Sequence, residues 1–307
     1  MKQGSQQVIE VQNLHKAYGA TIAVDDMSFA VNQGEIFGII GPNGAGKTTT
    51  IESLIGLRKP DRGQVRVLGL DPQRQSRELG QRIGSQLQQA ALPERIKVWE
   101  TLSLYASFYE RTVAWEPLLV EWGLEEKRNT AFGKLSGGQQ QRLFITLALL
   151  NDPQIVFMDE LTTGLDPQAR QATWDLMRGI RDKGKTVVLI THFMDEVEAL
   201  ADRVAIIDHG RLVALDRPQR LVSQLDSDTK LHFTLQNGFN VGLLDDLPDV
   251  TAVSQRDRQV TVQGTGALLA NVATTLAQHN AVPTDLRMEQ ANLEDVFLAL
   301  TGRRIRN

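Results

Sequence analysis

The sequence predicts an α/β fold built around a buried sheet with parallel strands. Three mainly apolar runs, residues 36–40, 155–158 and 186–190, are continuous enough to be strands covered on both faces. Each run is followed by a segment whose apolar residues recur at helical spacing, an order typical of parallel sheets. A glycine-rich turn joins the first run to its helix, and this strand, turn and helix together predict a phosphate site.

Shorter strands are expected around this sheet. Residues 8–11 and 23–31 have strand character and are separated by a turn at residues 18–20, so we expect an antiparallel flank. Residues 62–69 add one more strand, with turn signals on each side. Tyr18 lies just beyond the first strand and is either half-buried or free to stack on a flat base. The local sequence does not decide between these two interpretations.

The turn after the first buried strand has the spacing G-x-x-x-x-G-K-T. Its backbone N–H groups point at one spot, where the start of the next helix adds partial positive charge. Lys47 supplies a full charge for the β- and γ-phosphates, and the Thr48 hydroxyl is placed to ligate Mg²⁺. The sequence therefore predicts a nucleoside triphosphate site made of Gly41, Pro42, Asn43, Gly44, Ala45, Gly46, Lys47, Thr48 and Thr49.

Residues 83–150 are expected to be mostly helical. Trp99, Tyr105 and Phe108 lie on an apolar helical face, which we expect to be core, with a docking surface as the alternative. Ser136 precedes two glycines and a helix that runs through residues 143–150, so it is a good N-cap. The exposed N–H groups there form a partial anion site without a lysine. Without further context, such a start is more often an ordinary helix cap.

Two adjacent carboxylates, Asp159 and Glu160, follow the buried run 155–158. Acids at the end of a buried strand are costly unless they have a task, so surface acids are the less favoured alternative. In a phosphate-binding fold, Asp159 would hold Mg²⁺ and Glu160 would orient and deprotonate the attacking water. His192 follows the run 186–190 at the same edge of the sheet, where open α/β folds bind ligands, and is a candidate contact for the γ-phosphate.

The last third of the chain indicates a separate unit. Residues 203–208 and 211–214 form a predicted hairpin, and the sequence Asp216-Arg217-Pro218 breaks the pattern, so we place a boundary there. Beyond it, residues 230–235 and 259–263 alternate like half-buried strands, and residues 266–278 and 292–300 are expected to be helical. This predicts a small α+β domain without a catalytic constellation.

Composition limits the classes of function. The chain of 307 residues has 41% hydrophobic and 23% charged residues, a net charge of −4 and a pI near 5.8, which argues against a basic surface for nucleic acid. The absence of cysteine excludes disulfides and thiolate chemistry. We expect no signal peptide at the N-terminus, and no apolar stretch approaches the roughly 18 residues of a membrane span. Any work at a membrane would need a partner.

Residues 8–215 resemble the nucleotide-binding subunit of ATP-binding cassette (ABC) transporters. The motifs that carry the resemblance are the Walker A loop, the signature at residues 135–139, and the Walker B run that ends in Asp159 and Glu160. Residues 164–166 match the D-loop and His192 matches the switch histidine. Gln88 is similar to the Q-loop glutamine, with Gln86 and Gln89 as alternatives, and Tyr18 matches the aromatic residue that stacks on adenine. Leu161 departs from the family pattern, which often has proline there, but removes no reactive group.

The resemblance implies a P-loop NTPase core with an antiparallel β flank and a helical subdomain. It places the nucleotide-binding domain at residues 1–216, its helical subdomain at about 88–150, and a C-terminal accessory domain at 217–307. The implied ligands are ATP and Mg²⁺, with Glu160, His192 and Lys47 in catalytic roles. Mg²⁺ would be held by Thr48, Gln88 and Asp159. ATP would contact the Walker A loop, Tyr18, Gln88, Ser136, Gly138, Gln139 and Asp166.

The resemblance also implies partners. Two such domains would meet head to tail, so that Ser136 and Gly138 of one chain bind the γ-phosphate held by the Walker A loop of the other. Residues 292–298 resemble the tail of drug-resistance-type exporter ATPases, which pair with separately encoded permeases on the cytoplasmic side of the inner membrane. The second subunit could be identical or different, and no nucleic acid is expected.

The sequence disfavours two other functions. A soluble ABC ATPase that acts on ribosomes or DNA is disfavoured because the chain has a single Walker A motif and no room for a coiled coil between Lys47 and Asp159. An inactive regulatory cassette would lack Lys47, Glu160 or His192, and all three are present.

Overall fold

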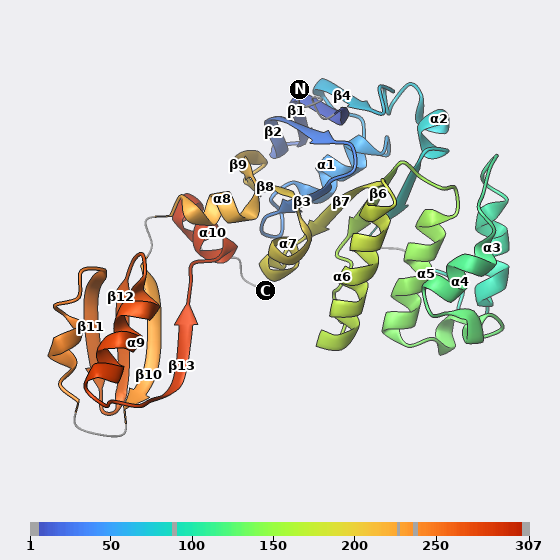
Figure 1. Cartoon of the computed structure of the whole chain (residues 1–307). Coiled ribbons are helices and arrows are strands. Elements are labelled where there is room, and N and C mark those ends of the chain that lie inside the picture. The colour runs from blue at the N-terminus through green and yellow to red at the C-terminus, as the bar shows by residue number, and fades with distance from the viewer. Residues whose placement is uncertain (1–5, 88–90, 226–227, 236–238, 303–307) are drawn as a thin grey trace. The chain divides into compact units, whose positions relative to one another are not determined.

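The computed structural model describes residues 6–87, 91–225, 228–235 and 239–302 (Figure 1). The chain divides into two compact units, one ending at Pro218 and the other comprising Gln219–Arg304. The first unit contains two sheets and two hydrophobic core clusters, and the second unit contains one sheet with a core cluster of its own. The first unit carries all of the candidate site residues.

The centre of the first unit is a six-stranded sheet with the order β5-β6-β7-β3-β8-β9. Neighbouring strands are parallel from β5 to β8, and only β9 is antiparallel to its neighbour. The bounds are β3 Ile36–Ile40, β5 Ile83–Gln86, β6 Ile155–Asp159, β7 Thr186–Thr191, β8 Arg203–Asp208 and β9 Arg211–Asp216. Strands β3, β6 and β7 are buried along their whole length, as their continuous hydrophobicity predicted.

Alternate residues of these strands enter two different cores. Phe37, Phe157 and Val188 pack with α1 (Lys47–Leu54) and the flanking sheet, whereas Val156 and Leu189 pack with the helices on the other face. This division follows from the pleat, which points successive side chains to opposite faces of the sheet. Both faces are therefore apolar, and polar groups gather at the strand ends.

The flank is a three-stranded antiparallel sheet with the order β2-β1-β4. Its strands are β1 (Gln7–Tyr18), β2 (Thr21–Asn32) and β4 (Arg62–Val67). The antiparallel pairing and the turn at residues 19–20 were predicted, but β1 and β2 are longer than expected, at 12 residues each. The register shifts between them mark bulges, which let polar residues interrupt the alternation without ending the strands.

The expectation of mostly helical structure from residue 83 is wrong at its start. Residues Ile83–Gln86 form β5, which pairs in parallel with β6. A run of four residues is too short to show a period, so only the neighbouring strand selects the extended form. A short helix, α2 (Ser76–Gly80), precedes it.

The helical group that follows contains α3 (Val98–Ala106), α4 (Trp115–Glu121) and α5 (Gly137–Leu149), with 3₁₀ turns at Glu125–Lys127 and Phe132–Lys134. Its helices share one core cluster with the sheet. Phe108, predicted as core, is 62% exposed, and Leu104 on α3 is 46% exposed. The helix ends at Ala106, so the helical face assumed for Phe108 does not extend to it.

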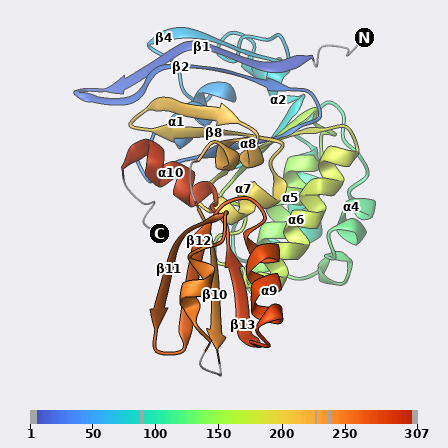
Figure 2. The same ribbon diagram turned by 60° about the vertical axis from the view of Figure 1, so that its left-hand side comes forward.

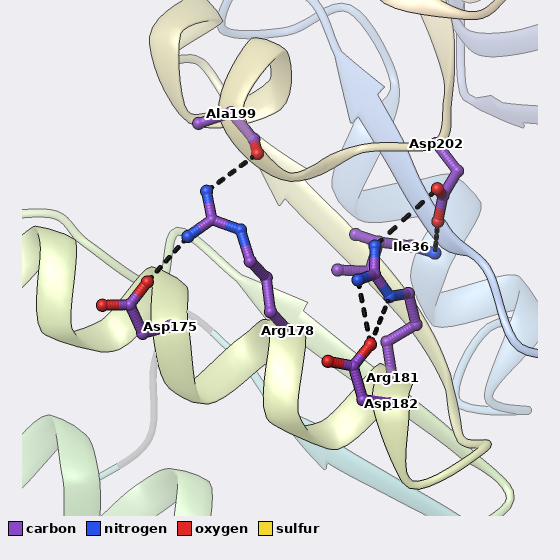
Figure 3. Close-up of polar contacts among 7 residues, drawn as sticks. All are labelled: Ile36, Asp175, Arg178, Arg181, Asp182, Ala199 and Asp202. Atoms are coloured by element: carbon purple, nitrogen blue, oxygen red, sulfur yellow. Dashed lines mark hydrogen bonds and ion pairs between the residues drawn. The ribbon is translucent and has the colours of Figure 1, made fainter.

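Two arginines of α6 (Pro167–Asp182) make contacts with α7 (Met194–Leu200) and with the residues that follow it (Figure 3). Arg178 Nη2 donates to the Ala199 carbonyl at 3.0 Å, joining the two helices, and Arg178 Nη1 donates to Asp175 at 2.7 Å. Arg181 pairs with Asp202, whose carboxylate accepts from the Ile36 N–H at 2.8 Å. The start of β3 and the ends of both helices are thus fixed to one another.

The second unit has a four-stranded antiparallel sheet with the order β11-β12-β10-β13 (Figure 2). The strands are β10 (Thr229–Leu235), β11 (Val250–Arg256), β12 (Gln259–Gly264) and β13 (Pro283–Glu289). The other elements are α8 (Pro218–Ser223), which begins at the end of the first unit, a 3₁₀ turn (Val241–Leu244), α9 (Leu268–Gln278) and α10 (Leu293–Thr301). Strands β11 and β13 were not predicted, because most of their residues are exposed and carry no clear alternation.

Candidate functional site

The glycine-rich loop lies between the end of β3 and the start of α1. A Cβ atom at Gly41 would lie 2.2 Å from the Ile207 carbonyl oxygen, and one at Gly46 would lie 2.2 Å from that of Ala23. Gly46 also has φ = +101°, a backbone conformation that side-chain-bearing residues rarely adopt. Glycine is therefore required at both positions by close approach to neighbouring strands.

The N-terminus of α1 is open. Its N-cap is Gly46, which has no side chain to bind the free N–H groups of the first turn. Thr48, Asn43 and Gly44 are exposed at this end, whereas Ala45 is buried and bonded through its carbonyl to the Gly210 N–H. The loop thus presents backbone donors and one hydroxyl outward while its base is fixed.

Lys47 is buried beneath this loop. Its Nζ donates to the carbonyl oxygens of Gly41 at 2.7 Å and Pro42 at 3.1 Å. Burial lowers the pKa of the Lys47 amine, and the negative charges of Glu160 and Asp159 oppose part of that shift. The Lys47 amine therefore lies close to the loop and to the two carboxylates that are predicted to act on phosphate.

Glu160 and His192 contact each other. Glu160 follows β6 and His192 follows β7, and the parallel pairing of these strands sets Asp159 opposite Ile190. As a result, Glu160 Oε1 lies 3.1 Å from His192 Nδ1, and both side chains are mostly buried. Asp159 is also buried, at the end of β6.

The backbone at Glu160 is strained. Its φ is +51°, which is uncommon for a residue with a side chain and costs of order 1–3 kcal/mol. The Glu160 N–H donates to the Ile190 carbonyl at 2.8 Å, so the strand β7 helps to hold this conformation. Strain of this kind persists where the surrounding structure determines the position of a side chain.

Tyr18 ends β1 and is 42% exposed. The Lys16 amine and the Arg58 guanidinium each lie 5.5 Å from the centre of its ring. Cations attracted to an aromatic face hold the ring in place. The half-buried and base-stacking interpretations of Tyr18 are therefore compatible, since the ring is both supported and partly exposed.

The signature residues begin α5. Ser136 is the N-cap, and its Oγ accepts from the Gln139 N–H at 3.4 Å while Gln139 Oε1 accepts from the Ser136 N–H at 3.0 Å. A Cβ atom on Gly138 would meet Leu165 at 3.6 Å. Figure 1 draws α5 with the helical group and α1 beside β3, so the two helix N-termini belong to different parts of the unit.

The segment between β6 and α6 is well anchored. Asp166 is the N-cap of α6, and its carboxylate accepts from the Ala169 N–H at 2.9 Å. Leu161, where the family pattern often has proline, is fully buried in the core shared with α5 and α6. A buried leucine fixes this turn by packing.

The predicted Q-loop residue Gln88 and its alternative Gln89 lie outside the described residues. The other alternative, Gln86, is the last residue of β5 and is buried. Its Nε2 donates to the Leu87 carbonyl at 3.4 Å, and its Oε1 has no hydrogen-bond partner among the described residues.

These residues fit ATP and Mg²⁺. An open helix N-terminus beside a buried, positively charged amine suits a polyphosphate. Mg²⁺ is usually held by one or two protein oxygens together with substrate phosphates, and the exposed Thr48 hydroxyl and the Asp159 carboxylate are ligands of that kind. Among the residues that the structure describes, no group of three or more His, Cys, Asp or Glu side chains could hold a metal ion.

One buried acid was missed in the sequence. Glu196 lies on α7 within the run Asp195-Glu196-Val197-Glu198, which has the composition of an exposed helix start, yet Glu196 is 0% exposed. The signal that could have found it is helical spacing, since Glu196 falls on the same face as the buried Leu200.

Comparison with known proteins gives consistent matches. A family described as ABC transporter matches residues 24–163. The Nod factor export ATP-binding protein I of Bradyrhizobium diazoefficiens is 38% identical over 312 residues, which cover 97% of this chain and 98% of the relative. The protein of the same name from Sinorhizobium fredii is 36% identical over 318 residues, covering 97% and 87%.

Solved structures of ABC transporter ATP-binding proteins are also similar to this chain. The ATP-binding subunit of an ABC transporter is 31% identical, with a TM-score of 0.65, and the match covers 71% of this chain and 92% of that chain. A dimeric bacterial ABC transporter cassette is 27% identical, with a TM-score of 0.61 and coverage of 68% and 98%.

Proposed function

Because the chain belongs to the ATP-binding proteins of ABC transporters, we propose that it hydrolyses ATP within a nucleotide-driven dimer and thereby powers an exporter. The observation that carries the mechanism is the 3.1 Å contact between Glu160 Oε1 and His192 Nδ1, close to the buried amine of Lys47. An acid, a histidine and a lysine converge there at the carboxyl ends of parallel strands.

The loop and Lys47 bind the phosphates. The backbone N–H groups at the start of α1 and the Lys47 amine neutralise the β- and γ-phosphates, and Thr48 and Asp159 would hold Mg²⁺. Held there, Mg²⁺ would supply positive charge that offsets the negative charge developing on the phosphates. Tyr18 supports the adenine ring through stacking, with Lys16 and Arg58 holding its own ring in place.

Glu160 is the general base in this proposal. Its carboxylate accepts a proton from the water that attacks the γ-phosphate. His192 Nδ1 fixes the direction of that carboxylate. The same ring would contact the γ-phosphate. The backbone of Glu160 is strained, and strain of this kind is typical of residues whose side-chain position is important for function.

The signature completes the site from a second chain. Ser136, Gly138 and Gln139 lie at the start of α5, away from the loop before α1. In a head-to-tail dimer they would meet the γ-phosphate on the partner, with Asp166 near the same interface. A dimeric cassette is among the structures similar to this chain, which supports pairing. Loss of the γ-phosphate on hydrolysis removes that bridge and lets the chains separate.

Export is proposed from the tail of the sequence and from the relatives, which are named as export ATP-binding proteins. Among the described residues, no helix has the length and hydrophobicity needed to cross a bilayer. From the relatives and from the tail of the sequence, we infer a separately encoded permease that holds the chain at the cytoplasmic side of the membrane. The exposed Leu104 and Phe108 support a contact surface on and after α3.

The test is Glu160→Gln. Loss of a general base is expected to lower turnover by about 10²–10⁴-fold while ATP binding is retained, because the amide keeps the size of the side chain. ATP with Mg²⁺ should then trap the variant as a dimer, measured by light scattering after size exclusion. Glu121→Gln, a surface carboxylate on α4 that pairs with Lys183, is the matched control.

Near-normal turnover in Glu160→Gln would refute the role of Glu160. Failure of that variant to pair with ATP and Mg²⁺, alone or with its permease, would refute the dimer mechanism.

A further inference from the structure

Asp61 lies at the point where strand β4 stops supporting β1. The pairing of these two strands ends where His15 stands opposite Arg62, so the last three residues of β1 extend beyond β4. Tyr18 is the last of the three. On this side of β1 the position of Tyr18 therefore depends on groups outside the strand pairing, and Asp61, which directly precedes β4, supplies them.

Asp61 makes hydrogen bonds with three successive residues of β1. Its N–H donates to the His15 carbonyl at 2.9 Å. Its Oδ1 accepts from Lys16 Nζ at 2.8 Å, and its Oδ2 accepts from the Ala17 N–H at 2.8 Å. The bonds from Lys16 and from the Ala17 N–H lower the pKa of Asp61, so the carboxylate is ionised at neutral pH. One carboxylate thus continues the hydrogen bonding past the end of β4, up to the residue before Tyr18.

The contact with Lys16 also reaches the tyrosine ring. The Lys16 side chain is only 15% exposed, and its Nζ lies 5.5 Å from the centre of the Tyr18 ring. A cation at this distance is attracted to the aromatic ring. Asp61 holds this cation in one position, whereas a lysine without a partner samples many rotamers. Asp61 is therefore connected to Tyr18 in two ways, through the backbone of Ala17 and through the charge of Lys16.

The second cation beside the ring is fixed to a different element. Arg58 lies 5.5 Å from the centre of the Tyr18 ring, and its Nε donates to Glu52 Oε2 on α1 at 3.0 Å. This pair relates the ring to the helix that follows the phosphate loop, whereas Asp61 relates it to the flanking sheet. Because Arg58 remains in place, loss of Asp61 should loosen the ring without removing it from the site.

We propose that Asp61 is a positioning residue for nucleotide binding, because its carboxylate fixes the end of β1 and the Lys16 amine and so holds the Tyr18 ring where adenine stacks. The inference rests on the proposed function, since it concerns the base of the same nucleotide. Asp61 acts through Tyr18 and makes no contact with the nucleotide. Its effect is therefore confined to the base, and the pair formed by Glu160 and His192 does not depend on it.

The experiment compares a ligand that has a base with one that has none. Calorimetric titration of the full chain measures the binding of ATP and of inorganic tripolyphosphate, each with Mg²⁺. Asp61→Ala should weaken ATP binding by about 3- to 10-fold, less than the loss of the whole stacking contact in Tyr18→Ala. Tripolyphosphate binding should be unchanged in both variants, because the phosphate loop is untouched. In turnover assays of Asp61→Ala, the KM for ATP should rise while kcat stays the same.

A double-mutant cycle separates positioning from a general defect. Asp61→Ala should add little to the effect of Tyr18→Ala, since Asp61 acts through the ring. Asp61→Asn keeps one acceptor oxygen for the Ala17 N–H but loses the charge that holds Lys16. Its ATP affinity should lie between those of wild type and Asp61→Ala, and this variant decides the matter if Asp61→Ala does not fold.

Asp71→Ala is the matched control. Asp71 lies between β4 and α2, and its Oδ1 likewise accepts from backbone N–H groups, those of Gln73 at 2.9 Å and Arg74 at 3.3 Å. These bonds stay within one turn and do not reach β1. The affinities of Asp71→Ala for ATP and for tripolyphosphate should therefore match those of wild type.

Wild-type affinity for ATP in Asp61→Ala, or in Asp61→Asn where Asp61→Ala is not folded, would overturn the positioning role. Equal losses of affinity for ATP and for tripolyphosphate, or full additivity with Tyr18→Ala, would overturn it as well, because the defect would then not act through the ring. Wild-type ATP affinity in Tyr18→Ala would overturn the stacking contact and this inference with it, but not the hydrolytic role of Glu160. Absence of ATP binding in the wild-type chain would instead overturn the proposed function.

Discussion

At the scale of single residues, the site depends on charged groups that are buried but not isolated. Lys47 is held by two loop carbonyls and by the charges of Glu160 and Asp159, while Glu160 is held by His192 and the backbone of β7. A buried charge with such partners keeps one position, whereas an exposed one samples many. The residues proposed to contact phosphate are therefore held in place by the chain's own contacts.

Lys47→Ala should weaken ATP binding itself, because it removes the only side-chain cation of the phosphate loop. Titration with a fluorescent ATP analogue measures the effect. Lys185→Ala is the control, since Lys185 lies at the opposite end of the same strands and pairs with Asp152. Equal affinity in wild type and Lys47→Ala would contradict the assigned role.

Glu196 should make stability depend on pH. Burial raises its pKa above the ordinary value of 4.5, so over an interval of pH the folded chain keeps a proton that the unfolded chain has released. Folding then becomes less favourable as pH rises through that interval. Replacing the group with glutamine removes this dependence.

We therefore expect the free energy of unfolding of Glu196→Gln, relative to wild type, to increase from about the ordinary pKa upward and to level off above the raised one. Denaturant unfolding at a series of pH values measures the difference, with Glu121→Gln as the surface control. A difference that is flat across this range, or that falls as pH rises, would contradict the assignment.

At the scale of elements, the start of α5 has more free hydrogen-bonding capacity than a helix cap needs. The Ser136 hydroxyl accepts from Gln139 at 3.4 Å, the long limit for such a bond. The N-cap of α10, Asn292, accepts from Glu294 at 2.8 Å and from Asp295 at 3.1 Å. The looser cap leaves the Ser136 hydroxyl able to take another partner.

Ser136→Ala and Asn292→Ala should each cost about 1 kcal/mol of stability as lost caps. Only Ser136→Ala should also lower ATP turnover and ATP-driven pairing, because only this hydroxyl is proposed to meet a phosphate. Thermal unfolding and ATP turnover of both variants separate the two effects. An equal loss of turnover in both would show that Ser136 acts as a cap alone.

At the scale of the whole molecule, one active site would require two chains. The phosphate loop precedes α1 and the signature begins α5, in different parts of the first unit (Figure 1). In a symmetric pair of chains, the phosphate loop of each chain can face the signature of the other, so that two such sites form. The similarity to a dimeric cassette is consistent with this arrangement.

Complementation tests this arrangement. A mixture of Lys47→Ala and Ser136→Ala chains forms dimers in which one composite site has both an intact phosphate loop and an intact signature. ATP turnover of the mixture should exceed that of either variant alone, measured at equal total chain concentration. No gain on mixing, with dimers present, would mean that the two motifs do not share a site.

The sequence predicted the fold class, and the similar ATP-binding cassettes confirm it. The sequence predicted those features of the site that consecutive residues build. The glycine spacing, Lys47, and the acids after a buried run can be recognised because a few consecutive residues build each feature. It was wrong for β5, incomplete for β11 and β13, and wrong about Phe108, because burial of these segments depends on neighbours far along the chain.

What the sequence determined by itself is the inventory of the site: a phosphate loop, two acids, a histidine and a capped helix. The tertiary structure alone decided which of them meet. The parallel pairing of β6 with β7 brings Glu160 to His192, and packing against distant elements buries Glu196, which looks like a surface acid in the sequence. The physical reason is that strand order and helix packing are set by contacts between distant residues, which no local pattern encodes.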